Sequence, residues 1–204
     1  MNALASKAGS MSFDTSLWVY CGSGLGVDSR HVEAARDLGR LLAARRIRLI
    51  YGGARIGLMG TLADAALGAG GEVVGIIPGH LDKTELGHRG ATELIVVDSM
   101  HRRKYMMFEL SDAFAILPGG LGTLDEAFEM LTWRKLGLHD KPVLLVDIAG
   151  YWQSLLRLID HVIAQGFAAP TDRDLYKVVS TVEELVQAVE TAPRPTLVAQ
   201  PERL

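Results

Sequence analysis

Cysteine, long apolar runs and excess basic charge are scarce in this sequence, and each scarcity excludes a class of protein. The 204 residues include one cysteine, Cys21, which rules out an intramolecular disulfide and a cysteine-rich zinc site. We interpret Cys21 as a small apolar residue at the end of a strand. No apolar stretch approaches the length that spans a membrane, so we expect no membrane partner. Lysine and arginine number 21 against 24 acidic residues, and nucleic-acid partners are not expected because duplex-binding proteins usually carry a basic excess.

The two ends of the chain lack the apolar periodicity of its middle. Residues 1–16 are rich in Ala, Ser and Gly and show no basic region followed by an apolar run. We therefore expect a flexible N-terminal tail, no signal peptide and a cytoplasmic location. Residues 192–204 contain three prolines and are expected to form a flexible C-terminal tail. Residues 17–191 are predicted to form a single domain, which suits a chain of this length.

The middle of the chain alternates short apolar runs with longer amphipathic segments. The short runs have the composition of strands buried on both faces of a parallel sheet; they are Leu17–Cys21, Ile47–Tyr51, Glu72–Ile77, Leu94–Val97, Ala113–Leu117 and Val143–Val146. Helices are predicted at Ser29–Ala44, Gly57–Leu67, Met100–Leu110, Thr123–Leu136 and Trp152–Ala164, and a last one after the capping-box sequence Thr181–Glu184. This alternation predicts an α/β fold with a doubly wound, mainly parallel sheet flanked by helices on both faces.

Loops that follow the strands are the expected ligand sites, because a doubly wound sheet binds ligands beyond the carboxyl ends of its strands. The loop Gly22–Gly26 follows the first strand but lacks the full dinucleotide fingerprint. Ser23 in this loop can offer a hydroxyl group and backbone N–H groups to a phosphate, although a plain tight turn explains the loop equally well. Gly52 and Gly53 end the second strand, and close approach of a ligand explains them at least as well as close packing does.

The segment Pro118–Thr123 is the most informative loop. Its glycines, Gly119, Gly120 and Gly122, lie between a predicted strand and a helix expected to begin at Thr123. Successive free N–H groups at the positive end of a helix form an anion site that suits a phosphate. No lysine precedes Thr123 as in a Walker A loop, so a triphosphate with magnesium is not implied.

Glu126 has two interpretations. Thr123 and Glu126 have the spacing of a capping box, and spacing alone favours that structural role. Alternatively, a carboxylate one helical turn from a bound phosphate could reach the anomeric carbon of an attached ribose and stabilise an oxocarbenium-like transition state or direct a water.

Three consecutive cations open another predicted helix. Arg102, Arg103 and Lys104 follow Met100 and His101, where the helix dipole disfavours positive charge. A nearby anion or Glu126 would make this arrangement tolerable. Successive side chains on a helix point about 100° apart, so the three cations cannot all face one ligand.

Together, these loops resemble the Lonely Guy (LOG) family of cytokinin riboside 5′-monophosphate phosphoribohydrolases, formerly called possible lysine decarboxylases. The segment Pro118–Glu126 matches the family's PGGxGTxxE motif, and Met100–Lys104 matches its MHxRK-type segment. The resemblance extends over about residues 17–190 and implies a Rossmann-like fold, a homodimer, and no metal or redox cofactor.

The resemblance also implies a reaction and a set of site residues. The expected reaction is hydrolysis of the N-glycosidic bond of AMP or an N6-substituted AMP, which releases the free base and ribose 5-phosphate. It implies Arg103 and Glu126 as the catalytic pair. In the mechanism that we expect, Arg103 contacts the phosphate or orients Glu126, which would also hold the carboxylate ionised. The phosphate-binding residues implied are Gly119, Gly120, Gly122 and Thr123 with Ser23, and the other substrate-binding candidates are Gly52, Gly53, Met100 and Lys104.

Other functions remain as alternatives. The main one is a non-catalytic nucleotide sensor or carrier on the same fold, since fold does not fix function. A dinucleotide-dependent oxidoreductase is disfavoured because the full fingerprint is missing, and nothing around the lysines indicates a pyridoxal phosphate site. For the dimer, the residues Met130–Trp133, Leu136 and Leu138 offer more apolar surface than one helix face needs, although core packing explains them nearly as well.

Overall fold

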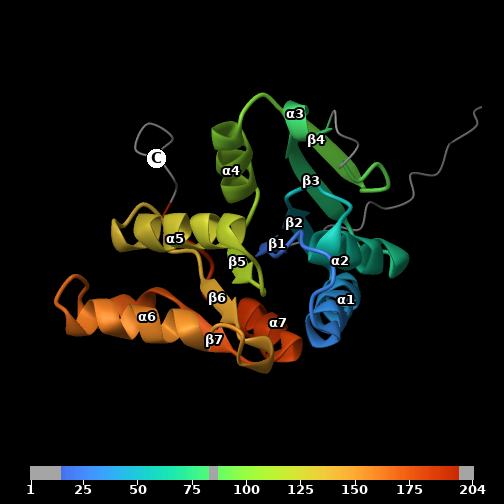
Figure 1. Ribbon diagram of the computed structural model, residues 1–204. Coiled ribbons are helices and arrows are strands. Elements are labelled where there is room, and N and C mark those ends of the chain that lie inside the picture. The colour runs from blue at the N-terminus through green and yellow to red at the C-terminus, as the bar shows by residue number, and fades with distance from the viewer. Residues whose placement is uncertain (1–14, 83–86, 198–204) are drawn as a thin grey trace, which may run out of the picture.

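The computed structural model describes residues 15–82 and 87–197, in which strands and helices alternate (Figure 1). The strands are β1 (Thr15–Tyr20), β2 (Ile47–Tyr51), β3 (Val73–Pro78), β4 (Glu93–Val97), β5 (Ala113–Ile116), β6 (Val143–Val146) and β7 (Lys177–Val179). The α-helices are α1 (Ser29–Ala44), α2 (Gly57–Gly68), α3 (Gly79–Asp82), α4 (Met100–Glu109), α5 (Leu121–Lys135), α6 (Gln153–Ala164) and α7 (Val182–Thr191). Two 3-10 helices, η1 (Ile148–Gly150) and η2 (Pro170–Leu175), follow β6 and α6.

One parallel sheet organises the molecule. Its strand order is β4-β3-β2-β1-β5-β6-β7, and every registered pair of neighbours runs parallel. The six predicted strands are present and the predicted fold class is confirmed. The sequence did not reveal β7, a three-residue edge strand in which Lys177 and Val178 are exposed, so its pattern resembles a loop.

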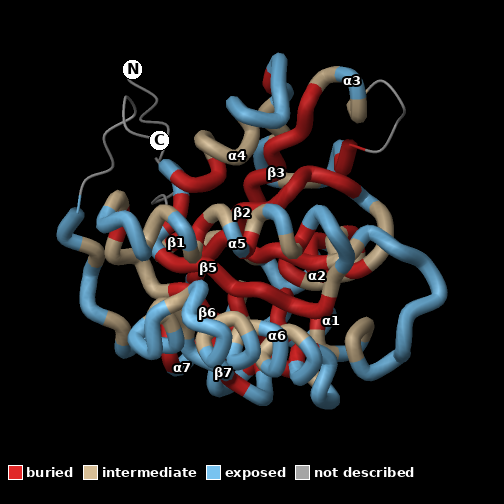
Figure 2. The backbone as a smooth tube through the Cα atoms, turned by 60° about the vertical axis from the view of Figure 1, so that its left-hand side comes forward, coloured by how far each residue is buried: buried red, intermediate tan, exposed pale blue. Residues whose placement is uncertain are grey.

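Helices cover both faces of the sheet (Figure 1). One core cluster joins the strands to α1, α2 and α7, and the other joins them to α4 and α5 with Trp152 just before α6. Figure 2 shows the buried strands enclosed by helices whose outer turns are exposed. The strand order reverses at the centre of the sheet, where β1 has β2 on one side and β5 on the other. The loops after β1 and β5 therefore lead to helices on opposite faces. Such a switch point opens a crevice at the carboxyl ends of the strands.

Helix caps explain which predicted boundaries are correct. The carboxylate of Asp28 accepts a hydrogen bond from Arg30 N (2.9 Å), and α1 begins at Ser29 as predicted. The hydroxyl of Thr181 accepts from Glu184 N (3.1 Å), while the Glu184 carboxylate accepts from Ser180 N rather than from Thr181 N. The last helix therefore begins where the capping-box spacing placed it.

The structure describes part of each predicted tail. The predicted N-terminal tail, residues 1–16, lies mostly outside the described residues, but Thr15 and Ser16 belong to β1, which pairs them with Ile47 and Arg48 of β2. Of the predicted C-terminal tail, residues 198–204 also lie outside. Within residues 192–197, Thr196 donates two hydrogen bonds to the carboxylate of Asp140. The segment after α7 therefore contacts the loop that precedes β6. Among the described helices, none has the length and apolar character needed to cross a membrane.

Candidate active site

A cavity of about 570 Å³ lies beyond the carboxyl ends of the central strands. Residues from the loops after β1, β2 and β5 line it, together with residues from α4, α5 and the segment before α6. Most predicted site residues are among them: Ser23, Gly52, Met100, Arg103, Gly119, Gly120, Gly122, Thr123 and Glu126. Its volume is within the range of small-molecule sites. Among the described residues, no three His, Cys, Asp or Glu side chains are grouped to hold a metal ion.

The start of α5 forms one end of this cavity. The helix begins at Leu121 with Gly120 as its N-cap, and no side chain caps it. The prediction that the helix begins at Thr123 is wrong by two residues, because glycine at the cap position leaves the first turn free to form earlier. The first N–H groups of a helix have no intrahelical acceptor, so those of Leu121, Gly122 and Thr123 can bind an anion here.

Backbone hydrogen bonds hold the loops around this helix start together. Gly22 N donates to Pro118 O (3.0 Å), and Leu58 N donates to Gly22 O (3.0 Å), so the segments after β1, β2 and β5 are joined directly. Gly57 has a φ of +59°, and a Cβ there would lie 2.5 Å from the Ser23 carbonyl carbon. The close approach of Gly57 holds the backbone of Ser23 at the cavity edge.

Arg103 is held by main-chain oxygens. Its Nε donates to Ile76 O (3.1 Å) and its Nη2 donates to Gly52 O (3.3 Å), so the guanidinium spans the ends of β2 and β3. The side chain is 12% exposed, and burial lowers the pKa of Arg103 although Glu126 opposes this effect. A Cβ on Gly52 would lie 2.1 Å from Arg103 Nη2. Gly52 therefore serves the site by leaving room for this cation.

Glu126 faces Arg103 from the next helix. Arg103 Nη1 and Glu126 Oε1 are 3.9 Å apart, and the Glu126 side chain is 15% exposed. The capping interpretation of Glu126 is wrong, because Thr123 is the third residue of α5 and does not cap it. Burial raises the pKa of Glu126 to about 7, and Arg103 offsets this only in part. Arg103 favours the ionised carboxylate as expected, but burial is the larger influence on the pKa of Glu126.

Two predicted substrate-binding residues do not line the cavity. Lys104 Nζ instead bonds to Glu129 (3.0 Å) and Asp125 (3.4 Å), joining α4 to α5. Gly53 has a φ of +74° and accepts a hydrogen bond from His88 N (2.8 Å), so it serves the turn after β2. Met100 does line the cavity, and its Sδ lies 3.8 Å from Arg103 Nη1.

Sequence reasoning missed several residues of the cavity wall. His31 of α1 and Tyr151 before α6 both line it, and Asp125 joins them from α5. The sequence could have indicated Asp125, since it directly precedes Glu126. His31 and Tyr151 gave no signal, because each is a single residue outside a glycine-rich loop.

Known proteins resemble this chain over most of its length. The family model described as "Possible lysine decarboxylase" matches residues 59–189. A cytokinin riboside 5′-monophosphate phosphoribohydrolase of Rhodococcoides fascians is 46% identical over 177 residues, covering 86% of this chain and 89% of that protein. The corresponding enzyme LOG3 of Arabidopsis thaliana is 46% identical over 172 residues, covering 84% of this chain and 80% of that protein.

Solved structures share the fold. The molybdenum cofactor carrier protein of Chlamydomonas reinhardtii superposes with a TM-score of 0.66 at 21% identity, covering 86% of this chain and 96% of that one. The molybdenum cofactor binding protein of Rippkaea orientalis gives 0.65 at 22% identity, with coverage of 87% and 96%. These similarities establish the fold and not the ligand. The family model and the two enzymes at 46% identity identify the sequence family: the chain belongs to the Lonely Guy (LOG) family of cytokinin riboside 5′-monophosphate phosphoribohydrolases.

Proposed function

We propose that this protein hydrolyses the N-glycosidic bond of AMP or an N6-substituted AMP. The observation that carries the proposal is the Arg103–Glu126 pair in one cavity of about 570 Å³ with the uncapped start of α5, from which Glu126 is a little over one helical turn away. An anion site and a buried carboxylate at this separation fit a phosphate and the anomeric carbon of the sugar that carries it. Relatives at 46% identity are named for this reaction.

Phosphate binding positions the substrate in this proposal. The N–H groups at the start of α5 and the Ser23 loop hold the phosphate, with Gly119, Gly120, Gly122 and Thr123 forming the turn. A Cβ at Gly119 would lie 2.1 Å from Thr123 Oγ1, so the turn and the threonine hydroxyl are closely packed. Binding energy from the phosphate, which does not react, then fixes the ribose against Glu126.

The bond change occurs beside Glu126. The C1′–N9 bond breaks, its electron pair leaves with the base, and the oxygen of a water forms the new bond to C1′. The ionised Glu126 carboxylate stabilises the positive charge on the sugar and accepts a proton from the water. The departing base takes up a proton from solvent at nitrogen, and Glu126 returns the proton of the water to solvent, so the products are the neutral base and ribose 5-phosphate.

A substrate panel tests the proposal. The wild-type protein is incubated with AMP, N6-isopentenyl-AMP and the two nucleosides that lack phosphate, and free base is measured by chromatography. We expect base from the nucleotides and little from the nucleosides, and we expect Glu126→Gln to bind AMP without releasing adenine. A carrier or sensor would bind nucleotides without releasing base from any of them, and this result would refute the hydrolase.

We also propose a homodimer in the cytoplasm, with no nucleic-acid partner. The segment Met130–Trp133, which the sequence offered for a dimer contact, is largely core, since Met130 is buried and Leu131 and Trp133 pack against the core. Leu136 is 67% exposed. Helix α6 offers more apolar surface for a dimer contact, because none of its twelve residues is buried and it has an apolar face. Light scattering coupled to gel filtration would detect a mass near twice 22.1 kDa, and a monomer at all concentrations would refute the dimer.

A further inference from the structure

Positive charge is scarce around the cavity. Of the described residues that line it, Arg103 and His31 are those whose side chains can carry a positive charge, whereas Asp125 and Glu126 are acidic. A phosphate monoester brings about two negative charges at neutral pH. Arg103 has two of its three guanidinium nitrogens bonded to strand carbonyls, and the third faces Glu126. His31 is therefore the other side chain in the cavity lining that is available to balance phosphate charge.

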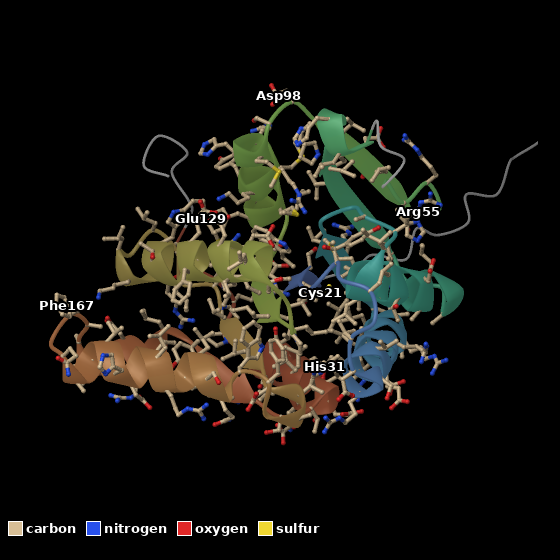
Figure 3. The ribbon with its side chains drawn as sticks, viewed as in Figure 1. Cys21, His31, Arg55, Asp98, Glu129 and Phe167 are labelled. Atoms are coloured by element: carbon tan, nitrogen blue, oxygen red, sulfur yellow. The ribbon has the colours of Figure 1, made fainter. Side chains whose placement is uncertain are left out.

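His31 is placed for that role by α1. It lies in the first turn of the helix, on the inner side below Cys21 in Figure 3. Its Nδ1 is inaccessible to solvent and has no hydrogen-bond partner. The carboxylate nearest in sequence, Asp28, is engaged by Arg30 Nε and Nη2. The protein encloses Nδ1, which leaves Nε2 as the ring nitrogen that a ligand in the cavity can reach.

Tyr151 connects His31 to the phosphate-binding turn. The two rings pack edge to face with centroids 5.4 Å apart. The Tyr151 hydroxyl donates to Gly119 O (2.7 Å), and the next residue, Trp152, donates from its indole nitrogen to Ile116 O (3.3 Å). The loop before Tyr151 takes an unusual path, since Ala149 (φ 54°) and Gly150 (φ 74°) are both left-handed. A backbone of this kind is maintained where it aims a side chain.

We propose that His31 binds the phosphate of the substrate and that Tyr151 is a positioning residue, which holds both the imidazole and the Gly119 peptide at the phosphate. His31 in its protonated form donates a hydrogen bond to a phosphate oxygen, in addition to the N–H groups at the start of α5. Tyr151 acts through its neighbours and does not need to touch the substrate. This inference rests on the proposed function for the identity of the phosphate ester.

Direct binding measurements separate this inference from the reaction. In the Glu126→Gln background, which prevents turnover, calorimetry gives the Kd of AMP and of adenosine. We expect His31→Gln to weaken AMP about tenfold, the loss of one charge-assisted hydrogen bond, and to leave adenosine unchanged. We expect His31→Lys to keep AMP affinity within a few-fold of the parent, since it restores the charge. Tyr151→Phe keeps the ring and should weaken AMP several-fold without affecting adenosine.

A matched histidine controls for general effects. His161 is exposed on α6 and does not line the cavity, so His161→Gln should change neither Kd. The assignment is overturned if His31→Gln leaves AMP affinity unchanged, if it weakens AMP and adenosine equally, or if His31→Lys binds no better than His31→Gln. Absence of base release by the wild-type protein refutes the hydrolase instead, and AMP binding by these variants still decides the role of His31.

Discussion

The Glu126 carboxylate combines burial with the proximity of a cation. It is almost enclosed, at 15% exposure, and it stands 3.9 Å from the cation Arg103. Burial raises its pKa to about 7 in spite of Arg103. A carboxyl group in this state gains or loses its proton within the physiological range, as groups that work in catalysis often do.

The pKa of Glu126 predicts the pH dependence of hydrolysis. If the ionised carboxylate acts on C1′ and the water, kcat should fall as pH decreases through about 7, because protonation removes the reactive form. The acidic limb of the kcat profile for AMP between pH 5 and 9 should therefore have a midpoint near 7, within about one unit. A profile flat down to pH 5 would contradict this role for Glu126.

Gly52 provides a second prediction at this scale. Gly52→Ala places a methyl group on Arg103 Nη2 and must displace the guanidinium from its strand carbonyls. We expect kcat/KM to fall on the order of 100-fold, the effect of a small misplacement of a catalytic group, while the protein stays folded.

Gly68→Ala is the matched control. A Cβ at Gly68, near the end of α2, meets no atom within 4 Å. Activity should be unchanged in this variant. Equal activity of Gly52→Ala and wild type would show that the position of Arg103 does not matter for the reaction.

Single residues differ in how far the sequence reveals them. Arg103 and Glu126 stand in recognisable segments, and the structure brings them together although 23 positions separate them, from 103 to 126. Lys104 was misjudged because a cation beside a site can equally bind a neighbouring helix, and only the rotation of α4 decides between the two. The contact between Tyr151 and Gly119 depends on an irregular loop with a left-handed alanine, which no sequence pattern predicts.

Helices α4 and α5 carry Arg103 and Glu126, the proposed catalytic pair, and Lys104 of α4 bonds to Asp125 and Glu129 of α5. Its side chain is 16% exposed, and its partner Glu129 is 22% exposed with one carboxylate oxygen buried and unpaired. Lys104 also lowers the pKa of Glu126, although burial is the dominant influence. This ion pair therefore holds the two helices in register and affects the site electrostatically.

Removal of Lys104 should change both stability and pH profile. Lys104→Met leaves Glu129 without its cation, so we expect the free energy of unfolding in urea to fall by about 1–3 kcal/mol. The acidic limb of activity should also move to higher pH, because a cation that favours the ionised Glu126 is lost.

Lys135, the last residue of α5, offers a comparison of the same residue type. It pairs with Asp172 at 2.6 Å but is 48% exposed. Lys135→Met should cost less than about 1 kcal/mol and leave the pH profile unchanged. If both variants behaved alike, the tie between α4 and α5 would have no special role.

Element boundaries follow from local chemistry where a side chain sets them. Asp28 and Thr181 begin α1 and α7 as the sequence predicted, because each provides a capping oxygen. The start of α5 was misplaced because its cap is a glycine without a side-chain signal. β7 was missed because its pairing with β6 comes from the tertiary fold rather than from its own apolar pattern.

The sheet as a whole was predictable because its pattern repeats. Alternating strands and helices specify parallel connections, and the loops after β1, β2 and β5 then meet at one edge. We propose that residues 17–191 form one domain, since both core clusters pack on opposite faces of this single sheet. The cavity wall was less predictable, because it joins residues from segments that are distant in sequence.

The C-terminal segment contributes to the stability of the whole molecule. Thr196 and Leu197 donate to the carboxylate of Asp140, with contacts of 2.6–3.2 Å. Deletion of residues 192–204 should lower the free energy of unfolding by about 1–2 kcal/mol, a modest loss because the contacts are exposed. Asp140→Ala should then have little effect in the shortened chain, and additive losses from the two changes would argue against the contact.

The hold on Arg103 by the carbonyls of Ile76 and Gly52 has a consequence for divergence within the family. Peptide oxygens are common to every sequence, so no side-chain replacement at residue 76 can delete that acceptor, and residue 52 needs only to remain without a Cβ. Substitutions in the other residues that line the cavity can thus change which base is accepted while the guanidinium of Arg103 stays in place.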